Sequence, residues 1–146
     1  KQVNDQHGHP FGDYVIGEIA KIGQETLRVE DIMGRVGGEE FLCVLPRIDV
    51  MQCMQIARRF VKNVNNYDFI IDSHATEQET MKISISVGVA TTSAEVEDSA
   101  QLYLQADKAL YQAKNKGKNC AVQYRAYMMH SSQHDYDMMQ PFDEDH

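Results

Sequence analysis

The chain has 146 residues, a hydrophobic share of 42% and a formal net charge of −8, which is the composition of a globular domain and excludes wholesale disorder. All 14 Lys and Arg and 17 of the 22 acidic residues precede residue 126, so the body carries −3 and the last 21 residues carry −5. This balance speaks against a nucleic-acid partner, and no apolar run has the length of a membrane span or the character of a signal peptide.

The first half of the chain predicts two helices around a hairpin. Apolar or small side chains recur at helical spacing over residues 13–27, at Val15, Ile19, Ile22 and Thr26. Two apolar runs, Ile32–Val36 and Phe41–Leu45, flank Gly37-Gly38, and two glycines there would accept the positive φ of a tight turn. Asp49 is a suitable N-cap for a second helix, whose expected inner face carries Val50, Cys53, Ala57, Phe60 (or Val61) and Val64.

The second half predicts strands, one helix and a tail. Phe69–Ile71 reads as a short strand and residues 72–80 as a polar loop. Alternation over residues 81–90 is the clearest strand pattern of the chain. A third helix is expected from Ser99 to Lys116, where Gly117 stops it, followed by a strand at Cys120–Tyr124. From residue 126 the pattern dissolves, so we expect a domain of residues 1–125 and a flexible acidic tail of residues 126–146.

The beginning of the chain and its cysteines bear on context. Lys1 opens the chain in a glycine-broken loop without a preceding element, so we expect an upstream part to be missing. The cysteines at 43, 53 and 120 form neither a CxxC motif nor a disulfide framework. We expect them to be reduced and buried, as in a cytosolic protein.

The strongest local signal is Gly37-Gly38-Glu39-Glu40-Phe41. Glycines let a phosphate approach the backbone, and a carboxylate beside them can hold the Mg²⁺ that nucleotide phosphates carry. Since side chains alternate along a strand, we expect one glutamate to face the metal and the other to brace the site. An exposed acidic hairpin is the alternative, and this stretch alone does not decide between them.

Two further clusters suit a nucleotide. Asn4, His9 and Asp13 offer the donors and acceptors of a guanine edge, although a polar loop and a helix cap explain them as well. Three lysines gather at the end of the third predicted helix: Lys114, Lys116 and Lys118. Stabilisation of the helix dipole explains the first two, whereas a triphosphate would explain all three.

Arg28 and Asp31 precede the hairpin, with Arg35 close by. Arginine is a natural phosphate partner that an aspartate can hold in place, but a surface ion pair explains these residues equally. In the tail, His130 and His134 would lie one helical turn apart and could bind a transition metal, although an unstructured acidic tail is the simpler interpretation.

Together these motifs resemble the GGDEF domain, the catalytic module of diguanylate cyclases. GGEEF at residues 37–41 is a variant of the signature, and the match extends through KxxNDxxGHxxGD at 1–13, ISISVGVA at 83–90 and ADKALYQAKNKGKN at 106–119. The resemblance implies an α+β fold like that of nucleotide cyclases and polymerase palms, with one central, mostly antiparallel sheet flanked by helices. The first strand and the helix ahead of it would lie upstream of Lys1.

The resemblance also implies a reaction. Two GTP molecules, one on each domain of a homodimer, condense into cyclic di-GMP with release of pyrophosphate. Glu39 would be the metal ligand for Mg²⁺ (or Mn²⁺) and the candidate general base, with Glu40 as its neighbour and Lys1 steadying the transition state. Substrate would be held by Asn4, His9, Asp13, Gly37, Gly38, Lys114 and Lys118. The RxxD motif of Arg28 and Asp31, joined by Arg35 and Arg59, would bind cyclic di-GMP as a feedback inhibitor.

One departure limits this reading. The second metal-binding carboxylate of the family, an Asp, would lie upstream of Lys1, so we expect residues 1–146 alone to be inactive. The alternatives are a catalytically inactive domain that senses GTP or cyclic di-GMP, and a dimerisation domain without a ligand. We expect a cytoplasmic domain under an upstream sensory or regulatory domain, in a parent protein that can be membrane-anchored.

Overall fold

The structure is a computed structural model that describes residues 9–72 and 76–130. The chain divides into two compact units, Lys1–Ser84 and Ile85–His146. No helix of the described part combines the length and apolarity needed to cross a membrane.

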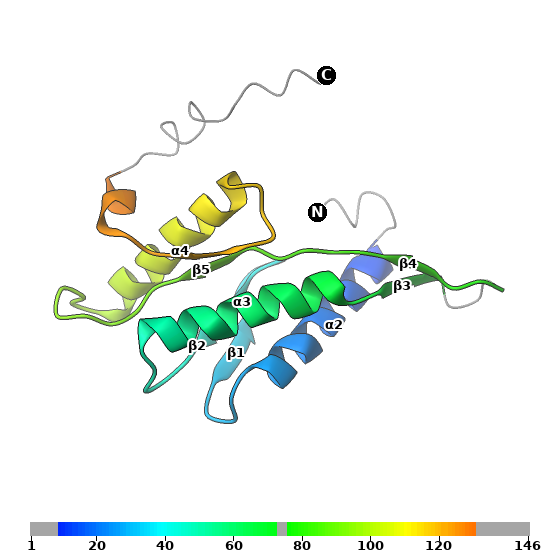
Figure 1. Cartoon of the computed structure of the whole chain (residues 1–146), viewed down its shortest axis with the longest axis horizontal. Helices are drawn as coiled ribbons and strands as arrows, with labels where there is room; N and C mark the ends of the chain where they lie inside the picture. Colours follow the sequence, from blue (N-terminus) through cyan, green and yellow to red (C-terminus); the bar gives the residue numbers. More distant parts are fainter. Residues whose placement is uncertain (1–8, 73–75, 131–146) are drawn as a thin grey trace, which may run out of the picture. The chain divides into compact units, whose positions relative to one another are not determined.

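The first unit is built on two packed helices, α2 (His9–Thr26) and α3 (Val50–Asn66), with two antiparallel strand pairs (Figure 1). The pair β1 (Ile32–Arg35) and β2 (Phe41–Val44) forms the predicted hairpin, and β3 (Phe69–Asp72) pairs with β4 (Glu79–Met81). The predicted inner face of α2 is buried, and α3, which packs on α2, buries Met54, Ile56, Ala57, Phe60, Val61 and Val64. Val50 and Cys53, predicted to lie inside, are only partly buried.

Local chemistry fixes the ends and the approach of these helices. Asp49 caps α3 as predicted, because its carboxylate accepts the Gln52 N–H at 2.8 Å. The helix α2 begins at His9, four residues before the predicted start, since a proline at position 10 suits the first turn of a helix. Gly23 allows α2 to lie close to its neighbours, because a Cβ there would stand 2.6 Å from Met33 Sδ and 3.0 Å from Phe60 Cζ.

The second unit contains β5 (Val87–Val89), α4 (Ser99–Asn115), β6 (Ala121–Gln123) and the short 3-10 helix η1 (Ala126–Met129). The strands β5 and β6 are parallel and α4 packs on both (Figure 1). Gly88 permits this packing, because a Cβ there would collide with the backbone of Ala106 and Leu110. Gly117 ends α4 as predicted, with φ of 101°.

The α+β class is confirmed, and two of the three strand pairs are antiparallel. In the described part the strands form three two-stranded sheets, and residues 82–86 of the strongest predicted strand have no ladder partner. The predicted start of the flexible tail is too early, because η1 places Met128, only 1% exposed, in a core with Ala109, Ala113 and Val122. The three cysteines are free, as expected, but partly rather than fully buried.

Candidate functional site

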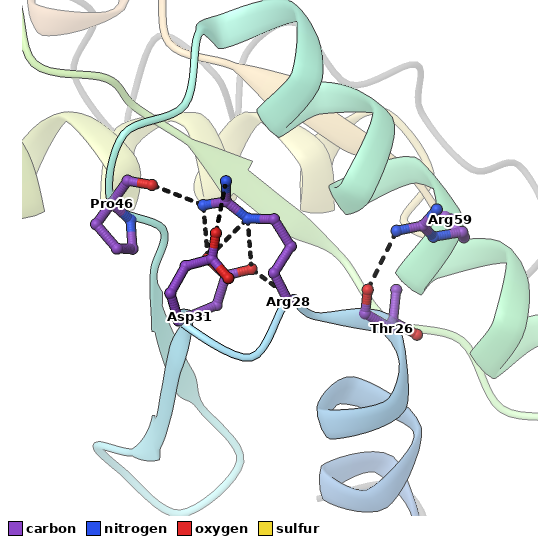
Figure 2. Close-up of polar contacts among 6 residues, drawn as sticks. Thr26, Arg28, Asp31, Pro46 and Arg59 are labelled. Atoms are coloured by element: carbon purple, nitrogen blue, oxygen red, sulfur yellow. Dashed lines mark hydrogen bonds and ion pairs between the residues drawn. The ribbon is translucent and has the colours of Figure 1, made fainter.

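The turn between α2 and β1 brings Arg28 and Asp31 together. Asp31 N–H donates to the Arg28 carbonyl at 3.0 Å, and Arg28 N–H donates to Asp31 Oδ2 at 2.7 Å. The guanidinium donates from Nε and Nη2 to the same carboxylate at 2.7–3.2 Å, and from Nη2 to the Pro46 carbonyl at 2.7 Å (Figure 2). The predicted pair is therefore a fixed part of this turn.

Burial and charge explain the state of the pair. The Asp31 side chain is 0% exposed and that of Arg28 is 29% exposed. Burial raises the pKa of the Asp31 carboxyl, but the hydrogen bonds and charge of Arg28 outweigh burial and hold that pKa below its usual range. The hydrogen bond to Asp31 raises the pKa of Arg28 in turn. Both groups are therefore charged at neutral pH.

A pocket of about 390 Å³ lies beside this pair. Arg28, Asp31 and Gln24 give it polar walls, and Leu27, Val29, Ile32 and Met33 give it apolar ones. Val29 is fully exposed, so its apolar side chain is accessible to a ligand at this pocket. The pocket can therefore offer a cation to an anion and an apolar wall to a flat ring.

The other two arginines assigned to this site have different contacts. Arg35 donates from Nε and Nη2 to the Gly38 carbonyl at 3.2 and 2.6 Å, and from Nε to the Gly37 carbonyl at 3.2 Å. Arg59 donates to the Thr26 carbonyl at 3.1 Å, where α2 ends (Figure 2). The contacts of the described residues thus place Arg35 with the hairpin turn and Arg59 with the α2 end, and neither with Arg28.

The hairpin turn carries the two glycines and two glutamates of the sequence motif. Val36 N–H and Gly37 N–H donate to the Glu40 carbonyl at 3.0 and 3.4 Å, so this is a wider turn than the tight one predicted. Neither glycine has a left-handed φ, which corrects the expected reason for their presence. A Cβ on Gly38 would meet no atom of the structure within 4 Å, and one on Gly37 only Glu40 Cβ at 3.9 Å. Neither backbone conformation nor packing within the described chain requires glycine here.

Glu39 and Glu40 are both exposed at this turn, so the structure does not separate a metal-facing from a bracing glutamate. Their oxygens are the hard ligands that Mg²⁺ prefers. The described residues contain no cluster of three His, Cys, Asp or Glu that could hold a metal ion, His130 included. The donor chemistry fits a magnesium ion that also takes phosphate and water ligands, and does not fit one held by the described protein groups alone.

The remaining predicted residues are spread over the chain. Asp13 is exposed on α2, and His9 is the first residue of that helix. Lys114 lies in the last turn of α4 in the second unit, and Lys118 follows Gly117 with φ of 63°; both are exposed. Lys1, Asn4 and His134 lie outside the described residues.

Two partners of Arg28 were missed by sequence reasoning. Pro46 takes part through its carbonyl oxygen, which every residue carries, so no sequence signal marks it. Glu30 Oε1 lies 3.4 Å from Arg28 Nη1. Its negative charge two residues after Arg28 in the sequence was the signal available.

Comparison with known proteins identifies the family. The family model described as "Diguanylate cyclase, GGDEF domain" matches residues 1–120. The chain belongs to the GGDEF domain family. It is 38% identical over 122 residues, 84% of its length, to the probable diguanylate cyclase DgcT of Escherichia coli K12. It spans 26% of DgcT and 31% of diguanylate cyclase A of Treponema denticola, so its relatives are much longer.

Solved GGDEF structures share the fold. The active GGEEF domain of a diguanylate cyclase from Vibrio cholerae matches with a TM-score of 0.72 and 31% identity, over 85% of this chain and 75% of that one. The GGDEF domain of DgcB from Caulobacter crescentus, solved in complex with c-di-GMP, matches with a TM-score of 0.76 and 27% identity, over 84% and 68%. The family and the cyclase fold predicted from the motifs are thereby confirmed.

Proposed function

We propose that this GGDEF domain is the catalytic module of a diguanylate cyclase that converts two GTP into cyclic di-GMP and two pyrophosphates. Each 3′-hydroxyl attacks the α-phosphate of the other GTP, the bond to pyrophosphate breaks, and the hydroxyl proton passes to a base. Because each domain holds one GTP, two copies have to face each other as a homodimer. We place the reaction in the cytoplasm, under the control of an upstream regulatory domain.

The observation that carries this proposal is the bare Gly37-Gly38 bend. Nothing inside the described chain requires glycine at these positions, while Arg35 holds both glycine carbonyls. A ligand whose phosphate chain lies against the backbone would require these positions to lack side chains. The two carboxylates that follow would be ligands for the metal ion of such a phosphate chain.

The residues have separate roles in this proposal. Glu39 would hold Mg²⁺ or Mn²⁺, and the ion supplies positive charge that offsets the charge of the reacting phosphates. Glu39 is also the candidate base, and Glu40 stands beside it. Lys1 would steady the transition state, and the guanine and phosphates would be held by Asn4, His9, Asp13, Lys114 and Lys118.

Product inhibition through Arg28 and Asp31 is part of the same proposal. The guanidinium is charged, held from two sides and partly exposed at a pocket with apolar walls. A dinucleotide presents phosphate anions and flat bases, which this combination suits. The relative DgcB has been solved with c-di-GMP bound.

The second candidate function is a catalytically inactive domain that binds GTP or cyclic di-GMP as a sensor. The Arg28–Asp31 pocket supports it, because binding of cyclic di-GMP there needs no metal ion. The full-length protein, incubated with GTP and Mg²⁺, decides between the two. Pyrophosphate and cyclic di-GMP as products support the cyclase, whereas binding of cyclic di-GMP without turnover selects the sensor.

A further inference from the structure

We propose that Glu30 weakens the binding of cyclic di-GMP at the Arg28–Asp31 pocket, because its carboxylate competes with the ligand for Arg28 Nη1. This inference rests on the proposed product site and names a residue that tunes its affinity. Glu30 lies between Arg28 and Asp31 in the sequence but contributes nothing to the pocket walls.

The hydrogen bonds of Arg28 leave one nitrogen for a ligand. Nε and Nη2 are taken by Asp31, and Nη2 also by the Pro46 carbonyl. Among the described residues Nη1 has no hydrogen-bond partner, and its recorded neighbour is Glu30 Oε1 at 3.4 Å. A phosphate that approaches Arg28 therefore meets the nitrogen beside which Glu30 already stands.

Glu30 and Asp31 differ in what they hold. Asp31 is 0% exposed and binds the backbone N–H of Arg28, so the turn depends on it. The Glu30 side chain is 43% exposed, and among the described residues its polar contact is the ion pair with Arg28. Loss of the Glu30 charge should leave the turn intact while removing a negative charge that repels the two phosphates of the ligand.

Calorimetric titration of the full-length protein with cyclic di-GMP tests this inference in four forms: wild type, Glu30→Gln, Arg28→Ala and Glu77→Gln. Glu77 is exposed and makes no recorded contact with Arg28, so its variant removes the same charge elsewhere. We expect Glu30→Gln to tighten binding by about 1.5- to 5-fold, the range of an exposed ion pair. The gain should shrink as ionic strength rises. Glu77→Gln should bind like the wild type.

The outcomes separate the inference from the product site. If Arg28→Ala abolishes binding while Glu30→Gln matches or weakens the wild type, Glu30 has no such role and the product site stands. An equal gain in Glu30→Gln and Glu77→Gln would reduce the effect to net charge and overturn the inference. If Arg28→Ala binds like the wild type, or the wild type does not bind, both the product site and the role of Glu30 are wrong.

Discussion

Two turns of the first unit carry motif residues, and the two differ in the contacts that hold those residues. The α2–β1 turn is held by contacts within the chain, because Asp31 binds both the backbone and the guanidinium of Arg28, and the Pro46 carbonyl accepts from the same guanidinium. The β1–β2 turn has Arg35 over its carbonyls, but its glycines have open space where side chains would lie and its glutamates are exposed.

The two turns differ in whether the structure of the chain itself accounts for their motif residues. The Arg28–Asp31 pair has a structural role that would preserve it without a ligand. Gly37 and Gly38 have no such role in the described chain, and the proposed function accounts for them by a ligand that binds there. Substitutions in the first turn should therefore change stability and inhibition, and substitutions in the second should change activity with little effect on stability.

Glu39→Gln should give the largest effect. We expect formation of cyclic di-GMP by the full-length protein to fall by about 10²- to 10³-fold, because the neutral amide loses the negative charge that would hold the metal ion on the phosphates. The free energy of unfolding should stay within about 0.5 kcal/mol of the wild type, since the side chain is exposed. Product assays and chemical denaturation measure the two, with Glu77→Gln as control. Activity within a fewfold of wild type would show that Glu39 holds no reacting group.

Gly38→Ala should separate activity from stability. A Cβ on Gly38 meets no atom of the described residues within 4 Å, so the free energy of unfolding should change by no more than about 0.5 kcal/mol. A methyl group against the phosphates should lower activity by about 10- to 100-fold through misplacement of the substrate. Gly34→Ala is the matched control, because a Cβ on this β1 residue also meets nothing within 4 Å. Equal activity of the two variants would contradict a nucleotide at the bend.

Asp31→Asn should act on the first turn. Asp31 accepts hydrogen bonds from both the backbone N–H and the guanidinium of Arg28. An uncharged amide cannot replace the carboxylate in both bonds, so the melting temperature should fall. The dissociation constant for cyclic di-GMP should rise by about tenfold, because Arg28 is no longer held for the ligand. Thermal unfolding and calorimetric titration measure these changes. An unchanged melting temperature would show that the pair does not hold the turn.

Acidification should reduce the stability that the same Arg28–Asp31 pair contributes, and this effect should be smaller than the preceding ones. The Asp31 pKa is lowered from 3.8 in the folded protein, so the stability that its charge contributes is complete above about pH 4 and is lost as pH falls through the lowered pKa. Denaturation of wild type and Asp31→Asn at a series of pH values isolates this residue. The difference between their unfolding free energies should shrink below pH 3.8. A difference that grows on acidification would reverse the assigned sign.

The sequence predicted what local periodicity and caps determine. The faces of α2, the Asp49 cap and the Gly117 stop were all predictable because neighbouring residues decide them. Residues 82–86 show the limit, since alternation predicts an extended chain but a ladder needs a partner strand. Met128 was missed because only tertiary packing with α4 and β6 buries it.

The site was predictable to a different degree. The spacing of Arg28 and Asp31 in the sequence was enough to predict that they pair, because a turn of four residues brings its ends together. Side-chain direction was not predictable for Arg35, whose reach to the glycine carbonyls depends on the width of the hairpin turn. The surroundings of Gly37 and Gly38 were not predictable either, because only the coordinates show that neither φ nor packing among the described residues requires glycine there.

The backbone amides of Gly37 and Gly38 test the central claim most directly. NMR spectra of the full-length protein, recorded while a non-hydrolysable GTP analogue and Mg²⁺ are added, report on each amide separately. If a metal-bound triphosphate lies against the bend, these two amide signals shift with the saturation curve of binding. Saturable binding that leaves both signals unmoved would place the nucleotide elsewhere and contradict the account.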